Sequence, residues 1–288
     1  MNHAAIRQNQ GFAVHVLHND SVELAMAPEL GAKVISLKNV HTGREWLWHP
    51  EEKLRLFKNL PRDNFAASPL VGMDECLPTI QPCSWRGREL PDHGEVWSQP
   101  WQVDEYDLLS GKLTASINLR NSPLAFQRTI SLTGNEIRFS YQLSNLAADR
   151  EHFVWAVHPL LRLVDGDVLE VPASTRELLN GHAWIDAVST AIPKANCAKV
   201  FACPVREGRA VITNEAQADR LEFVWNTAEN NSLGLWLTRG GWHGHHHFAI
   251  EPTNSNDDSL AIAAIREHCG SIPGHGTVSW EFRLRVGI

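Results

Sequence analysis

Three consecutive segments of the chain alternate apolar and polar side chains: L-T-A-S-I-N-L-R at residues 113–120, A-F-Q-R-T-I-S-L-T at 125–133 and E-I-R-F-S-Y-Q-L-S-N at 136–145. Alternation places every second side chain on one face of an extended chain, so each segment is predicted to be a strand with one buried face. Turn-forming residues separate the segments, at Gly111, Pro123 and Gly134-Asn135. This spacing is typical of a β-sandwich.

The alternation extends toward both ends of the chain. Two runs within residues 12–27 flank Asn19-Asp20 and predict a hairpin, and W-Q-V-D-E-Y-D-L at 101–108 predicts another strand. Helical pieces are expected only near 174–179 and 259–267. Because no linker divides the 288 residues, we expect one large antiparallel β-sandwich domain over 1–288.

The pattern breaks between residues 49 and 89, a stretch rich in proline. Long loops in compact proteins usually have a function or border a site. We therefore expect this stretch to be a loop at the rim of a site.

Composition excludes several classes of partner. The formal net charge of −7 argues against nucleic acid and anionic membranes, which require a concentrated basic surface. The N-terminal residues lack the apolar core of a signal peptide, and no apolar run is long enough to span a membrane. We expect a cytoplasmic protein.

The five cysteines show no paired C-x-x-C spacing, so neither a disulfide framework nor a structural zinc site is predicted.

The richest stretch for chemistry is L-W-L-T-R-G-G-W-H-G-H-H-H-F-A-I-E-P-T-N-S-N-D-D at residues 235–258. Glu251 follows an apolar run and precedes Pro252, so we place it at the end of a strand. A carboxylate held there can act as a general base. The alternative is a solvated glutamate without a function.

Two other short segments place a histidine among apolar or aromatic neighbours. They are P-D-H-G-E-V-W at residues 91–97, with His93, and W-A-V-H-P-L-L at 155–161, with His158. With the opening G-A-K-V-I-S-L at 31–37, T-G-R-E-W-L-W at 42–48 and the closing P-G-H-G-T-V-S-W-E-F at 273–282, their order resembles the aldose 1-epimerase, or galactose mutarotase-like, superfamily. The resemblance implies a β-sandwich called a supersandwich, with a sugar site in a cleft on one sheet.

The resemblance also implies catalytic roles. His158 matches the general acid of the superfamily, Glu251 its general base, and His93 the histidine near the ring oxygen. No cofactor is implied, because anomer exchange requires only that one proton leaves the C1 hydroxyl and another reaches the ring oxygen. The alternative for His158 is a hydrogen-bonded core histidine, and for His93 a turn residue.

The histidines at 243, 245, 246 and 247 admit a metal site, because His243, His245 and His247 would share one face of an extended strand. No carboxylate with ligand spacing accompanies them, so we expect no metal there and a polar face near the cleft. His245 and His247 are candidates to bind sugar hydroxyls. Trp97 is a further candidate, because flat indole faces stack on sugars, although core filling explains most tryptophans.

The segment Gly72-Met73-Asp74-Glu75-Cys76 occupies the region where related enzymes carry substrate-binding arginines. Asp74 and Glu75 are candidates to bind hydroxyls, with an exposed loop as the alternative. An acidic pair near the site would repel a phosphorylated sugar, so we expect a neutral one. Nearby arginines that could replace the missing group are Arg62, Arg86 and Arg88.

The sequence therefore favours an enzyme that interconverts the α and β anomers of a neutral sugar. A non-catalytic carbohydrate-binding protein on the same fold is the alternative, since fold does not determine function. A polysaccharide lyase is disfavoured because it would need a strongly basic cleft.

Overall fold

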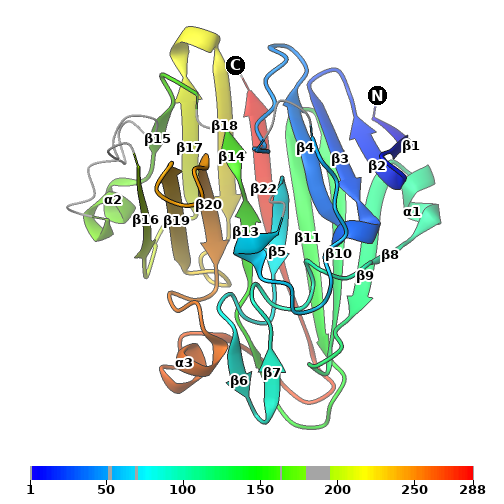
Figure 1. Cartoon of the computed structure of the whole chain (residues 1–288), viewed down its shortest axis with the longest axis vertical. Helices are drawn as coiled ribbons and strands as arrows, with labels where there is room; N and C mark the ends of the chain where they lie inside the picture. The colour runs from blue at the N-terminus through cyan, green and yellow to red at the C-terminus, as the bar shows by residue number, and fades with distance from the viewer. Residues whose placement is uncertain (1, 51–53, 69–70, 163, 180–194, 288) are drawn as a thin grey trace.

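The computed structural model describes residues 2–50, 54–68, 71–162, 164–179 and 195–287. Two large sheets dominate it (Figure 1). The first sheet has ten strands, which in spatial order are β1 (His3–Asn9), β2 (Phe12–His18), β3 (Val22–Ala27), β4 (Lys33–Asn39), β5 (Met73–Cys76), β13 (Ala156–Pro159), β20 (His246–Thr253), β19 (Ser232–Arg239) and β16 (Asn196–Ala202), with β14 (Leu161–Arg162) also paired to β20.

The second sheet has eight strands, which in spatial order are β15 (Val168–Glu170), β17 (Arg209–Asn214), β18 (Asp219–Trp225), β22 (Thr277–Gly287), β11 (Glu136–Asn145), β10 (Leu124–Thr133), β9 (Lys112–Asn118) and β8 (Gln102–Val103). Two smaller pairs are β6 (Cys83–Trp85) with β7 (Arg88–Leu90) and β12 (Glu151–Phe153) with β21 (Gly270–Ile272). The helices are α1 (Glu105–Leu109), α2 (Ala173–Leu178) and α3 (Leu260–Ile265), with short 3₁₀ turns η1 (Pro28–Leu30), η2 (Phe65–Ala67) and η4 (Glu215–Gln217).

The main core lies between the two sheets. Alternate side chains of both contribute to it, such as Leu24 and Phe248 from the ten-stranded sheet and Ile130 and Phe139 from the eight-stranded sheet. The pairing of neighbouring strands is antiparallel throughout the two sheets, as between β10 and β11 and between β19 and β20. The predicted antiparallel β-sandwich is therefore confirmed, and so are the short helices near 174–179 and 259–267.

Two local predictions were wrong. Part of the stretch at 101–108 forms α1, because the side chain of Asp104 caps this helix by accepting from the backbone N–H groups of Tyr106 and Asp107. The stretch at 49–89 is not one loop, because it contains η2 and β5, a strand inside the ten-stranded sheet. The expectation that it borders a site is met, since Phe65 and Ile80 line a cavity. All four residues of β5 are buried, so polarity does not alternate along it and the strand signal is lost.

Within the described residues, no helix combines the length and apolar character needed to cross a membrane.

Candidate active site

The candidate site lies on the outer face of the ten-stranded sheet, around a cavity of ≈ 250 Å³. In β20, Phe248 and Ile250 point into the core between the sheets. The alternation of a strand therefore directs His247 and Glu251 to the opposite face, where both line the cavity. Neighbouring strands and loops add His93, His158, Lys199 and Asp258.

Glu251 is fully buried, and its two carboxylate oxygens face different groups. Oε1 lies 3.5 Å from Nε2 of His158, and Oε2 lies 3.5 Å from Nζ of Lys199. Gly234 on β19 is directly opposite, and a Cβ there would come within 3.1 Å of Oε2. Neither oxygen has a hydrogen-bond partner among the described residues. A buried carboxylate left in this way can accept hydrogen bonds from a ligand.

The position of Glu251 corrects one expectation, since β20 does not end at Pro252 but continues to Thr253. On the side facing β13 and β14, β20 pairs with described residues only at His247 and Phe248 and again at Thr253. Pro252 lies where this ladder is interrupted, so its missing N–H is tolerated.

His158 lies on β13, opposite Asp74 of β5. Its ring contacts those of His93 and Phe65 edge to face, with centroids 5.2 Å and 5.3 Å away. Burial, followed by the charges of His93 and of nearby lysines, lowers the pKa of His158 well below its usual value. Its imidazole is therefore mostly neutral at neutral pH. Its Nδ1 is also buried and has no hydrogen-bond partner in the described part of the protein.

His93 reaches the cavity from a loop, where its backbone has a φ of 57°. Nδ1 of its ring lies 2.8 Å from Oδ1 of Asp92, and the ring stacks on Phe65 with centroids 3.7 Å apart. Burial alone would raise the pKa of Asp92, but His93 and the backbone N–H of Phe65 lower it. The charged Asp92 fixes the orientation of the ring and leaves Nε2 available for a ligand.

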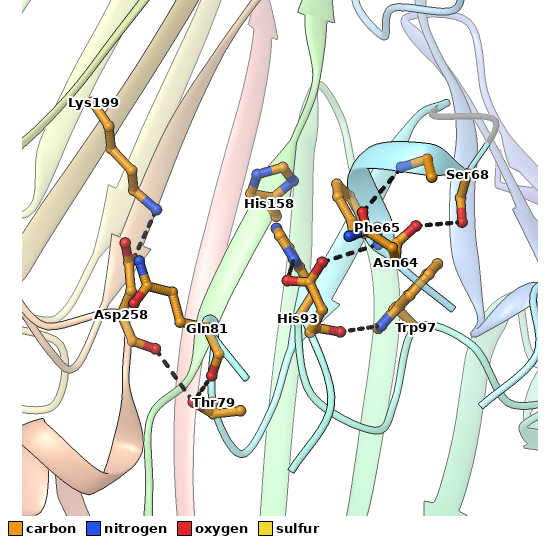
Figure 2. A network of polar contacts seen from close by, with 12 residues as sticks. Asn64, Phe65, Ser68, Thr79, Gln81, His93, Trp97, His158, Lys199 and Asp258 are labelled. Carbon is orange, nitrogen blue, oxygen red and sulfur yellow. Dashed lines mark hydrogen bonds and ion pairs between the residues drawn. The ribbon is translucent and has the colours of Figure 1, made fainter. Parts of the chain in front are cut away.

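Lys199 and Asp258 belong to the same cavity, although no motif in the sequence indicated them. Nζ of Lys199 donates to Oδ1 of Asp258 at 2.8 Å. In Figure 2, this pair lies on one side of His158 and Phe65 lies on the other, with His93 below His158. The sequence did not indicate Lys199 because it belongs to β16, a strand without a recognisable motif. Its pairing with β19 brings β16 to the site.

Aromatic side chains form much of the remaining wall, with Phe65, Trp236 and Trp242 among the lining residues. Flat rings of this kind pack on the C–H faces of sugars. Trp97, a predicted sugar-stacking residue, does not have this role, because it is 1% exposed, donates to the backbone carbonyl of Asp92 and does not line the cavity.

Asp74 and Glu75 do not line the cavity either, and neither lies in an exposed loop. Asp74 faces the same side of the sheet as His158 but is bound to Lys33 at 2.5 Å. Glu75 points the other way, into the core, where it accepts hydrogen bonds from Arg128, Tyr141 and Trp155. Each charge is paired, so the expected repulsion of a phosphate by this acidic pair loses its basis.

The histidine cluster does not form one face of a strand. β20 begins at His246, and His243 lies in the preceding turn with a φ of 50°. Only His247 lines the cavity. His245 is half-buried and packs against Trp48. No group of metal-ligating side chains occurs in the residues for which the structure gives positions.

The arginines considered as substitutes lie away from the cavity lining. Arg86 and Arg88 pair with Glu151 beside the β6–β7 hairpin, and Arg62 is exposed. Among the described residues that line the cavity, the only lysine or arginine is Lys199.

A scan against protein-family models and a search of curated proteins both find no match. Among solved structures, a galactose mutarotase-like protein from Clostridium acetobutylicum superposes with a TM-score of 0.72 at 13% identity, over 99% of this chain and 98% of that one.

Two further solved structures have the same fold. A galactose mutarotase related enzyme from Lactobacillus acidophilus gives a TM-score of 0.69 at 12% identity, over 96% of this chain and 97% of that one. A protein provisionally named aldose 1-epimerase from Klebsiella pneumoniae gives 0.74 at 14% identity, over 97% and 81%. Similarity at this level of identity establishes the fold, and the chain thus has the fold of the aldose 1-epimerase, or galactose mutarotase-like, superfamily.

Proposed function

We propose that the protein interconverts the α and β anomers of a neutral aldose by general acid and base catalysis. The observation that carries this proposal is the buried Glu251 carboxylate. It has no hydrogen-bond partner in the described structure and lies 3.5 Å from Nε2 of His158, at a cavity that His93 also lines. A base and an acid side by side at a small cavity match a reaction that moves two protons at neighbouring oxygens of one hemiacetal. The fold neighbours named as mutarotase-like proteins support the same reaction class.

The chemistry assigns one proton transfer to each group. Glu251 takes the proton of the C1 hydroxyl, the bond between C1 and the ring oxygen breaks, and the ring oxygen takes a proton from His158. Rotation about the C1–C2 bond and reclosure, with both transfers reversed, yield the other anomer and restore both side chains. The lowered pKa of His158 makes its imidazolium a minor form but a strong acid when it forms. His93 is placed to orient the ring oxygen.

The charge of the cavity supports a neutral substrate. Among the residues that the structure describes, its lining includes three carboxylates, of Asp92, Glu251 and Asp258, and one permanent cation, Lys199. The excess of negative charge disfavours a phosphate or a carboxylate on the sugar. His247, with both ring nitrogens buried and no hydrogen-bond partner in the described chain, is available to sugar hydroxyls.

The test compares wild type with Glu251→Gln on a panel of neutral aldoses, with anomer exchange followed by polarimetry or magnetisation-exchange NMR. The amide keeps the shape of the side chain but cannot accept a proton, so we expect exchange to slow by at least about 100-fold while sugar still binds. Glu215→Gln, at an exposed position on η4, is the matched control and should keep the full rate.

A Glu251→Gln variant as active as wild type would contradict the assignment of the base. If the wild type accelerated no sugar while some sugars still bound saturably, the protein would be a carbohydrate-binding protein instead.

A further inference from the structure

Lys199 lies two strands away from Glu251 and points into the same cavity. It pairs with Trp236 of β19, and Glu251 pairs with Gly234 of the same strand. Because Gly234 has no side chain, nothing on β19 separates the lysine from the carboxylate, and Nζ approaches Oε2 to 3.5 Å. The direction of Lys199 is therefore set by the register of three strands.

The far end of Lys199 is held by Asp258, whose own position is fixed by its backbone. The carbonyl oxygen of Asp258 accepts from the N–H groups of Ile80 at 2.9 Å and Gln81 at 2.8 Å, and its carboxylate accepts from Nζ of Lys199 at 2.8 Å. The ammonium also lies 5.2 Å from the ring centroid of Phe201, where a cation is favoured. These contacts hold the ammonium beside Glu251.

The charge of Lys199 is permanent in this setting. Burial would lower its pKa, but the charges of Glu251 and Asp258 outweigh this effect and raise it. A protonated lysine cannot act as a base or form a Schiff base with the open aldehyde. What it can do is attract the carboxylate.

The contact with Glu251 orients the carboxylate without saturating it. Oε2 lies 3.5 Å from Nζ of Lys199, and Oε1 lies 3.5 Å from Nε2 of His158. Both distances are longer than an ordinary hydrogen bond. The carboxylate thus stays between two groups and keeps lone pairs for the C1 hydroxyl.

The other titratable groups around Glu251 cannot replace this cation. His158 of β13 and His247 of β20 are mostly neutral, because burial lowers the pKa of each well below its usual value. Cys76 of β5 interacts electrostatically with Glu251, but burial raises the pKa of its thiol well above its usual value, so it carries no charge. Asp258 opposes the effect of Lys199 through its negative charge.

We propose that Lys199, anchored by Asp258, is a positioning residue that keeps Glu251 ionised and directed at the C1 hydroxyl. This role rests on the proposed function, in which Glu251 is the base. In this proposal, the ability of Glu251 to accept a proton depends on Lys199 of β16, although Lys199 itself transfers no proton in the reaction.

The first test is the pH profile of kcat/KM for anomer exchange in Lys199→Met. Loss of a cation this close favours the protonated carboxyl, so the acid limb should move to higher pH by about one unit or more. At pH values on that limb the rate should fall at least about tenfold, with a smaller loss at high pH. Lys199→Arg should keep the acid limb in place, whatever its maximal rate.

Lys112→Met, which removes an exposed cation on β9, is the matched control and should leave the profile unchanged. A rate that falls equally at all pH values in Lys199→Met, or a KM that rises with an unmoved acid limb, would overturn the proposal. The first would show a structural role and the second direct sugar binding.

A second measurement needs no catalysis. The side-chain carboxyl carbons of ¹³C-labelled glutamate are titrated by NMR in wild type and in Lys199→Met, with Glu251→Gln identifying the signal of Glu251. We expect its midpoint to move to higher pH by about one unit or more in Lys199→Met, and an unmoved midpoint would refute the proposal. Failure of anomer exchange in the wild type would refute only the proposed function, because the titration still tests the effect of Lys199.

Discussion

At the scale of single residues, the site places the buried Glu251 carboxylate beside buried imidazoles that are mostly neutral. His158 and His247 are 6% and 1% exposed, and burial is the first cause of the low pKa of each. Such groups affect stability as well as chemistry, because a proton that binds the unfolded chain but not the folded one favours unfolding.

For His247, this linkage predicts a dependence of stability on pH. Its pKa is lower in the folded chain than in the unfolded chain, where it is about 6.5. The contribution of His247 is therefore present above that pH and is lost as pH falls, at up to about 1.4 kcal/mol per pH unit. His247→Gln should reduce the loss of unfolding free energy between pH 7.5 and 5.5 by roughly 1 kcal/mol, measured by urea denaturation.

His246→Gln is the control, because His246 is the exposed neighbour on the same strand. It should show the pH dependence of wild type. Equal pH dependence in wild type and His247→Gln would contradict the interpretation.

At the scale of elements, the turn that carries His93 is shaped by backbone contacts. His93 and Gly94 have φ angles of 57° and 75°. The N–H of His93 donates to Ile80 at 2.7 Å, and the N–H of Glu95 donates to Leu77 at 2.7 Å. Gly94 packs so closely that a Cβ would lie 2.0 Å from the carbonyl oxygen of Leu77. This contact explains why glycine follows the histidine.

Gly94→Ala should therefore lower the free energy of unfolding by more than the strain of a left-handed backbone alone would explain. Gly87 provides the matched control, because its φ is 74° but a Cβ there would meet nothing within 4 Å. We expect Gly87→Ala to lose about 1 kcal/mol of unfolding free energy and Gly94→Ala to lose clearly more. Gly94→Ala should also slow anomer exchange by displacing His93. Equal losses for the two variants in urea denaturation would contradict this prediction.

At the scale of the whole molecule, Glu75 links the two sheets through the core. It lies on β5 of the ten-stranded sheet and accepts from Arg128 of β10 at 3.0 Å and from Tyr141 of β11 at 2.8 Å. Both partners belong to the eight-stranded sheet. A residue first considered for sugar binding instead connects the layers that support the site.

Removal of Glu75 alone should lower the free energy of unfolding far more than removal of both Glu75 and Arg128. We expect Glu75→Leu to lower the free energy of unfolding by about 3 to 5 kcal/mol, because Arg128 is left buried without its counter-charge. The double variant Glu75→Leu with Arg128→Met should recover much of this loss. Tryptophan fluorescence in urea measures both, and additive losses would show that the two charges act independently.

Urea denaturation of the wild type also tests the prediction of one domain over 1–288. If the chain is one domain, we expect a single cooperative unfolding transition.

The sequence by itself determined the sheets and the order of the segments that carry chemistry. Alternation of polarity is local, so strands such as β10 and β11 could be read directly from neighbouring residues. Short motifs and their resemblance to a known superfamily indicated His93, His158 and Glu251, which the structure brings around one cavity. The alternation of polarity failed at β5, where both faces are buried, and at α1, where a single capping aspartate outweighs it.

Only the tertiary structure decided which side chains meet. Asp74 and Glu75 are adjacent in sequence but point to opposite faces of β5, whereas Lys199 and Glu251 are 3.5 Å apart only because β16 and β20 both pair with β19. Such contacts depend on the register between strands distant in sequence. That register follows from packing and hydrogen bonding across the whole sheet, which no local pattern of residues encodes.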